Sequence, residues 1–365
     1  MTRLANEHGA INLAQGFPNF PTPDLLKEAA VRAIRGDINQ YAITWGSKRL
    51  RDAIAAKYSA MYGMTVDPET EITVTCGATE AMVATLMALI DPGDEVIVFE
   101  PFYENYGPDA VLCDARPVFV SLAPGEPLDL DRLAAAFSPR TRALILNTPG
   151  NPSGVVFNRP ELEGIAALCQ RHGVWVVTDE IYEHILYEGA HIPIGSLPGM
   201  RERTVTISGA SKTFSVTGWR IGTIIAPAEL TDAIRKVHDF LTVGAPAPLQ
   251  DGLAAAMEVL GRSFYDQLAG EYRARRDLLH RALLDAGFRC RPPAGAYYIL
   301  ADFSAISELA DHDFARWLIV ERGVASVPGS SFFSRPELGR HYVRFAFCKT
   351  EQLLREAAAR LRGAS

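Results

Sequence analysis

One lysine stands in a stretch whose neighbours suit it for covalent chemistry. Lys212 follows a short β-branched run, residues 204–207, that we interpret as a buried strand. Small residues and hydroxyls surround it, and partial desolvation among them favours a neutral amine that can condense with an aldehyde. Arg220 follows in the same stretch and offers a planar fork of donors that suits a phosphate dianion. The stretch therefore predicts a site for a phosphorylated aldehyde.

Two other interpretations of this stretch compete with the first. Most lysines of soluble proteins are solvated surface charges. The run Ser211-Lys212-Thr213 also resembles the end of a phosphate-binding P-loop, but that motif needs glycines where Ser211 and Thr206 stand. The nucleotide interpretation is rejected, and the rest of the chain must decide about the lysine.

The elements that would position this lysine alternate along the chain. Strand-like runs cover 72–75, 95–99, 117–120, 143–146, 174–178 and 205–207; helical patterns cover 23–35, 48–62, 79–90, 160–172, 180–186, 248–260 and 264–285. Such alternation predicts an α/β fold with a mostly parallel sheet between helices. Later strands at 297–300 and 343–347 indicate a smaller α+β region. We predict a large domain over residues 25–264 and a small domain formed by 1–24 and 265–365.

Parallel sheets bind ligands where their strands end, and several strands here are followed by suitable side chains. Ala78 and Thr79 open a helix whose N–H groups suit a phosphate, although small residues there also make an ordinary tight turn. Tyr103 could stack on a planar ring or belong to the core. Asn151 lies in an Asx/Pro/Gly loop that places amide donors at the sheet edge, or forms a simple turn.

Asp179 ends an all-apolar strand, where a carboxylate is costly to bury without a cationic partner. A pyridinium nitrogen would be such a partner, and Tyr182, on the same helical face, could donate to the ring's phenolate oxygen. The competing interpretation makes Asp179 a helix N-cap. Near the C-terminus, Arg344 lies within an apolar strand and requires an anion, either a bound carboxylate or an internal salt bridge. Together these residues outline a pocket for pyridoxal 5′-phosphate (PLP).

Composition narrows the class of protein. The 365 residues carry 36 Lys and Arg against 43 Asp and Glu, a net charge of −7 that argues against nucleic acid as a partner. Five scattered cysteines without CxxC spacing favour reduced thiols in the cytoplasm over disulfides or a metal site. The longest apolar run is too short to span a membrane, and no signal peptide is recognisable.

The motifs resemble those of class I/II aminotransferases of PLP fold type I, over nearly the whole chain. The resemblance rests on Asn151-Pro152-x-Gly154, Asp179-x-x-Tyr182, Lys212, Thr217-Gly218-Trp219-Arg220-x-Gly222 and Arg344. The runs 12–18, 39–41 and 327–332 are similar to those of kynurenine, methionine and glutamine aminotransferases. Such a family member is a homodimer with shared active sites, and it transfers an amino group from an L-amino acid to a 2-oxo acid by a ping-pong mechanism.

The resemblance also implies a role for each residue. Lys212 would bond to PLP and act as general base and acid, and Asp179 would pair with the ring nitrogen. The ring would be contacted by Tyr182, Asn151 and Tyr103. The phosphate would be held by Ala78, Thr79, Arg220 and, from the partner subunit, Tyr41. The substrate α-carboxylate would be bound by Arg344, Asn151 and the backbone at Gly16.

Two features depart from the family pattern. Many relatives have serine where Gly209 stands, as a phosphate ligand, so we expect Ser208 or Ser211 to compensate, or the phosphate to have one donor fewer. The chain also begins close to Asn12, so we expect a short N-terminal arm. A cysteine-conjugate β-lyase would share every residue named, whereas a PLP-binding sensor would need an added DNA-binding segment that we do not expect. The sequence leaves the amino donor, the oxo-acid acceptor and the pathway open.

Overall fold

The computed structural model describes residues 1–122 and 126–363 and is built around a seven-stranded sheet. Its order is β2-β8-β7-β6-β5-β3-β4, and all pairs are parallel except those made by β8, which runs opposite to both neighbours. The strands are β2 (Ile72–Thr75), β3 (Glu95–Glu100), β4 (Arg116–Ser121), β5 (Thr141–Asn147), β6 (Trp175–Asp179), β7 (Thr204–Gly209) and β8 (Gly222–Ile225). The prediction of a mostly parallel sheet is confirmed.

Both faces of this sheet are buried under helices. Along β3, Val96 and Val98 join the cluster packed with α4 (Ala78–Leu89), α5 (Tyr106–Leu112) and α9 (Ala228–Thr242). The alternate residues Ile97 and Phe99 join the cluster on the opposite face, under α7 (Arg159–His172). A strand buried on both faces reads as a continuous apolar run, which is why these strands were recognisable from sequence.

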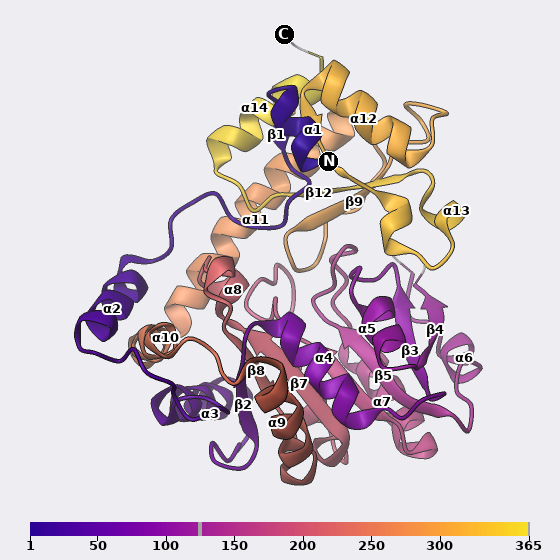
Figure 1. Ribbon diagram of the computed structural model, residues 1–365. Helices are drawn as coiled ribbons and strands as arrows, with labels where there is room; N and C mark the ends of the chain where they lie inside the picture. Colours follow the sequence, from indigo (N-terminus) through magenta and orange to yellow (C-terminus); the bar gives the residue numbers. More distant parts are fainter. Residues whose placement is uncertain (123–125, 364–365) are drawn as a thin grey trace.

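Local capping explains where the helices begin and end. Asn158 and Glu161 form a capping box at the start of α7, and Gly173 ends it with φ 67°. Ser47 caps α3 (Lys48–Tyr62) by accepting from the Leu50 N–H, and Gly63 closes it with φ 66°. Helix α3 and α2 (Asp24–Arg35) both pack against α10 (Ala247–Val259), beside the edge strand β2 in Figure 1.

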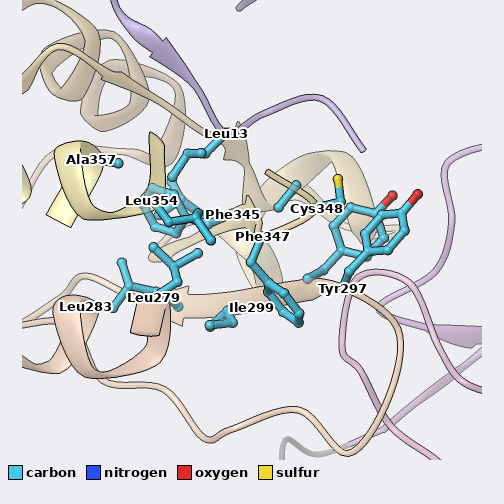
Figure 2. Close-up of a cluster of buried hydrophobic side chains, with 14 of the residues drawn as sticks. Leu13, Leu279, Leu283, Tyr297, Ile299, Phe345, Phe347, Cys348, Leu354 and Ala357 are labelled. Carbon is cyan, nitrogen blue, oxygen red and sulfur yellow. The ribbon is translucent and has the colours of Figure 1, made fainter. Parts of the chain in front are cut away.

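A second, antiparallel sheet lies beyond the strand ends of the first, at the top of Figure 1. Its order is β11 (Val327–Pro328), β12 (Tyr342–Ala346) and β9 (Tyr298–Asp302), with α11 (Arg262–Asp285), α12 (Asp311–Arg322) and α14 (Glu351–Leu361) around it. The short β1 (Ile11–Asn12) pairs with β10 (Val324–Ala325), next to α1 (Thr2–Glu7). Figure 2 shows Leu13 from this N-terminal segment packed among Phe345 and Leu354. The same cluster includes residues of the 181–187 segment, and the predicted domain boundaries stay a prediction.

One predicted helix is wrong. Residues 181–184 form turns, and the backbone after them bonds with residues 294–296 instead of with itself, so no helix forms. Several elements were not predicted from sequence at all, among them β8, β10, β11, α1, α5, α9, α12 and α14, together with the short helices α6 (Leu130–Ala134), α8 (Ala210–Thr213) and α13 (Pro336–Gly339). The other predicted helices and strands are present, with ends shifted by a residue or two.

Candidate active site

A cavity of about 240 Å³ lies where the strands of the large sheet end and the small sheet begins. Strand β2 and the parallel strands β5, β6 and β7 end at this edge, and β8, which runs the other way, begins there at Gly222. The structure brings ten of the predicted site residues to its wall: Gly16, Ala78, Thr79, Tyr103, Asn151, Asp179, Tyr182, Lys212, Arg220 and Arg344. Residues from seven separate segments of the chain thus meet in one site.

Lys212 projects from the short helix α8, directly after β7. Its Nζ lies 3.3 Å from the Gly16 carbonyl oxygen and about 6 Å from the centres of the Tyr182 and Tyr297 rings, at 6.0 and 5.8 Å. Burial among these groups lowers the pKa of the Lys212 ammonium to about 8, although Asp179 opposes the shift. A large share of this amine is therefore neutral and nucleophilic in mildly alkaline solution.

One end of the cavity suits a phosphate group. The first turn of α4 presents unpaired backbone N–H groups and the positive end of the helix dipole at Ala78 and Thr79. The Arg220 guanidinium lies directly over Gly77, so close that a Cβ added at Gly77 would collide with it. Arg220 itself has φ 54° and donates to the Thr217 carbonyl at 3.0 Å, which aims its side chain back across the helix start. Helix and guanidinium together form an anion-binding cradle.

Asp179 lies at the other end, on the last position of β6, and is 7% exposed. It accepts hydrogen bonds from the Tyr106 hydroxyl at 2.8 Å and from the Ile181 N–H at 3.2 Å. Burial raises the pKa of the Asp179 carboxyl, and no ion pair with it occurs among the described residues. The turns that follow Asp179 are not a helix, so the N-cap interpretation fails. A cationic ligand atom would supply the partner that this carboxylate lacks.

The opposite wall carries a second cation, Arg344, which is 6% exposed on β12. Its guanidinium donates to Asn151 Oδ1 at 2.9 Å and to the Ala14 carbonyl at 3.1 Å, and its Nε has no partner in the described part of the chain. The face of the guanidinium lies 4.4 Å from the Tyr298 ring centre and 4.7 Å from that of Phe332. The described residues provide no carboxylate for Arg344, so the alternative of an internal salt bridge fails and an anion must come from a ligand.

Several lining residues were not predicted as members of the site, among them Tyr106, Tyr298 and Asp109, whereas Asn147 belongs to the Asx/Pro/Gly loop that was expected to place amide donors there. Tyr106 stands three positions after Tyr103, a helical spacing that could have revealed it, and the two rings meet edge to face at 5.6 Å. Tyr298 lies at the start of a predicted strand, and its hydroxyl is 3.2 Å from that of Tyr182. Asn147 donates to the Asp179 carbonyl oxygen at 2.9 Å. Asp109 lines the cavity from α5, and no simple sequence signal distinguishes it.

The prediction that Ser208 binds the phosphate is wrong. Its hydroxyl does not reach the cavity but donates to Glu183 at 2.6 Å, on the far side of β7. Glu183 also accepts from Lys57 at 2.6 Å and from the Tyr62 hydroxyl at 2.5 Å, and we call these four residues the Glu183 cluster. Side chains alternate between the two sides of a strand, which sends Ser208 away from the site. Ser211 lines the cavity instead.

Gly209 and Tyr41 complete the comparison with the predicted site. A side chain at Gly209 would meet the Ile221 carbonyl oxygen at 2.6 Å, so this backbone has no room for the serine of the family pattern. Tyr41 lies on the segment between α2 and α3, is 87% exposed, and does not line the cavity of its own chain. Its predicted role in a partner subunit stays a prediction.

The arrangement matches a known family. The model for aminotransferases of class I and II matches residues 8–361, and the chain belongs to this family. It is an enzyme that catalyses transamination, with amino acids and oxo acids as substrates. The fold resembles that of the family's solved structures, as the α/β architecture predicted.

Individual relatives are similar over almost their whole length. The chain is 39% identical to human kynurenine–oxoglutarate transaminase 1, covering 99% of this chain and 93% of the relative. It is 40% identical to the methionine aminotransferase of Escherichia coli, with 99% and 94% covered. The solved structure of N-succinyldiaminopimelate aminotransferase from Mycobacterium tuberculosis superimposes with a TM-score of 0.97 at 41% identity, covering 100% of this chain and 96% of that one.

Two classes of feature are absent from the described residues. Within 1–122 and 126–363, no helix is both long and apolar enough to cross a membrane. The same residues contain no group of three or more His, Cys, Asp or Glu side chains that could hold a metal ion.

Proposed function

We propose that this aminotransferase uses pyridoxal 5′-phosphate, held between the Arg220 cradle and Asp179. One observation carries the proposal: a lysine with a lowered pKa stands in a single cavity with an anion-binding cradle and a buried carboxylate that lacks a cation. These are the three groups that a phosphorylated pyridine aldehyde needs. Family membership supports the same cofactor.

When bound, PLP supplies an aldehyde that bonds to an amine and a ring that accepts the electron pair left when the substrate α-proton departs. Lys212 is the amine that would hold the aldehyde. With an amino acid bound in its place, the Lys212 Nζ would act as the general base for the substrate α-proton, which its lowered pKa favours, and as the acid that returns this proton to the cofactor. Release of a 2-oxo acid and entry of a second oxo acid complete a ping-pong cycle.

The surrounding residues orient the ring and keep it protonated. Asp179 would pair with the ring nitrogen, and Tyr106 and the Ile181 N–H hold the carboxylate in place for it. Tyr182 and Asn151 would contact the ring oxygen, and Tyr103 would cover the ring face. Ala78, Thr79, Ser211 and Arg220 would hold the phosphate. All of these side chains line the same cavity, which supports the assignment.

Arg344 binds the substrate α-carboxylate, with Asn151 and the backbone at Gly16 beside it. The geometry supports this role because Asn151 Oδ1 and the Ala14 carbonyl fix the guanidinium from one side and leave Nε open. A bidentate carboxylate suits such a fork. The guanidinium carbon also lies over the rings of Tyr298 and Phe332, which contact it through cation–π interactions.

The substrate side chain extends into an open groove that continues from Gly16, Lys212 and Arg344. Its wall includes Phe17 and Pro328, and the described lining residues contain no further lysine or arginine. A side-chain carboxylate would meet neither a lysine nor an arginine there, and Glu104 on the same wall would repel it. We therefore propose an aromatic or long apolar L-amino acid, or an amide such as glutamine, as the donor, in line with relatives named for kynurenine and methionine. These relatives favour transamination over the β-lyase reaction.

The active form is a homodimer in which Tyr41 reaches the phosphate of the partner's site. Tyr41 is 87% exposed in one chain, and its neighbours Ile38 and Ile43 are 41% and 50% exposed, so this segment presents apolar surface without cover. A second copy of the chain would bury it.

A single half-reaction tests the proposal. PLP-loaded protein is mixed in turn with kynurenine, methionine, glutamine, phenylalanine and aspartate, without any oxo acid, while the cofactor spectrum is followed. We expect conversion to the pyridoxamine form with one equivalent of 2-oxo acid for the neutral donors, and a much slower response to aspartate.

Other outcomes would overturn parts of it. Continuous release of ammonia and pyruvate from a cysteine conjugate would identify a lyase. A spectrum that responds to no amino acid would contradict the proposed chemistry, and fastest conversion with aspartate would contradict the proposed substrate class.

A further inference from the structure

Tyr298 lies between the end of the site that would bind the substrate carboxylate, at Arg344, and the end that would bind the cofactor ring, at Tyr182. It is 3% exposed on β9, and the register of the small sheet pairs Arg344 with Leu300, two positions away on the same face. Tyr298 and Arg344 are therefore diagonal neighbours, and the guanidinium carbon lies 4.4 Å from the Tyr298 ring centre. The ring belongs to the carboxylate-binding end of the site.

The hydroxyl of the same side chain points to the other end. It lies 3.2 Å from the Tyr182 hydroxyl, and a Cβ added at Gly16 would collide with it. Gly16 thus leaves room for this hydroxyl, which lines the cavity beside Lys212. Phenylalanine in place of Tyr298 would preserve the ring contact with Arg344 and remove the hydroxyl's contacts with Tyr182 and Tyr297.

The hydroxyl pair can share only one proton at a time. Tyr182 has a single O–H, and in the proposed function this O–H donates to the ring oxygen of PLP. The bond between the two tyrosines must then be donated by Tyr298 and accepted by Tyr182. A hydroxyl that accepts a hydrogen bond becomes a stronger donor, because successive hydrogen bonds polarise one another.

We propose that Tyr298 is a positioning residue that fixes the Tyr182 proton toward the cofactor's ring oxygen. This inference rests on the proposed binding of PLP. It adds a residue that acts through Tyr182 and couples the carboxylate-binding end to the ring end, because one side chain contacts both.

The test uses PLP-loaded Tyr298→Phe. A weaker donation from Tyr182 stabilises the ionised ring oxygen less, so the pH midpoint of the cofactor's absorbance change should rise by about 0.2–0.5 pH unit. The affinity of the apoprotein for PLP should fall by about twofold to fivefold. We expect kcat to fall while KM for the donor stays nearly constant, since the ring beneath Arg344 is kept. Tyr298→Leu, which also removes the ring, should raise KM.

A control and a double variant separate positioning from packing. Tyr272→Phe removes a buried hydroxyl that has no partner among the described residues, on a ring stacked 5.6 Å from Tyr297, and should leave the pH midpoint unchanged. In a Tyr182→Phe background, Tyr298→Phe should have no further effect on the midpoint.

Three results would decide the matter. An unchanged midpoint in Tyr298→Phe overturns the inference, as does an equal shift in the Tyr182→Phe background. If Tyr182→Phe alone leaves the midpoint unchanged, the proposed contact of Tyr182 with the ring oxygen fails instead. The failure of the inference and that of the underlying function are therefore distinguishable.

Discussion

Asp179 at the end of β6 and Glu183 in the turn after it are buried carboxylates with opposite electrostatic surroundings. Glu183 accepts from Lys57, Tyr62 and Ser208, and the Lys57 ammonium is the main cause that lowers the pKa of Glu183 against the effect of burial. Asp179 is also buried, yet its hydrogen bonds come from neutral groups and its pKa is raised. Glu183 is paired with a cation of its own chain, whereas Asp179 has no cationic partner among the described residues. This difference indicates that Asp179 is the carboxylate that would bind a cationic ligand.

The same contrast separates the two sides of β7. The Ser208 hydroxyl donates a hydrogen bond to Glu183 on one side. The Lys212 amine faces the cavity on the other side, where it contacts the Gly16 carbonyl and has a lowered pKa. We therefore expect substitutions on the cavity side to affect catalysis and substitutions in the Glu183 cluster to affect stability.

The largest expected effect is that of Lys212→Ala. It removes the amine that bonds to PLP and moves the proton, so kcat should fall by at least about 10⁴-fold. The free energy of unfolding of the apoprotein should not fall, because the substitution removes a partly desolvated cation. Turnover assays and urea denaturation of the same preparation measure both quantities. Near-normal turnover would contradict the assignment of Lys212.

Asp179→Asn comes next and breaks the ion pair proposed with the ring nitrogen. Removal of one partner of a buried pair costs about 3–5 kcal/mol, so the half-reaction should slow by about 10²–10⁴-fold. The amide is isosteric and leaves no unpaired carboxylate in the apoprotein, which should remain at least as stable as the parent. Circular dichroism during urea denaturation measures the free energy of unfolding. A lower value for the Asp179→Asn apoprotein would show that Asp179, like Glu183, stabilises the fold.

Glu183→Gln should show the reverse pattern. Lys57, whose side chain is 13% exposed, would lose its counter-ion, so the free energy of unfolding should fall by about 3–5 kcal/mol. The double variant Lys57→Met with Glu183→Gln should recover part of this loss. If Glu183→Gln instead slowed the half-reaction as much as Asp179→Asn at unchanged stability, the contrast between the two carboxylates would be wrong.

The smallest expected effect is that of Asp109, whose contribution to stability depends on pH. Burial raises the pKa of this carboxyl to about 7, and its Oδ2 has no partner among the described residues. The native chain keeps the proton that the unfolded chain loses near pH 4, so stability falls as pH rises from 4 to 7 and then levels off. Asp109→Asn should therefore stabilise the apoprotein by about 2–4 kcal/mol at pH 8 and by clearly less at pH 5. An equal gain at both pH values would rule out this titration.

Most site residues could be predicted because each follows a strand that is recognisable on its own. Buried parallel strands are continuous apolar runs, and the residues after them must meet at one edge of the sheet. Ser208 was misplaced because it lies inside the strand, where a single position decides which side a side chain faces. Tyr298 and Asp109 were missed because neither stands at a strand exit, and only packing brings them to the cavity. The cytoplasmic location and the homodimer stay predictions.

The sequence by itself determined the family, the alternation of strands and helices, and the residue types that the chemistry requires. These depend on local patterns and on short motifs, which the chain carries without reference to its fold. The tertiary structure decided which buried charges are paired. Lys57 lies on α3, far from Glu183 along the chain, and no cation of residues 1–122 and 126–363 forms an ion pair with Asp179. Pairing depends on distances between remote segments, and those distances exist only once the chain has folded.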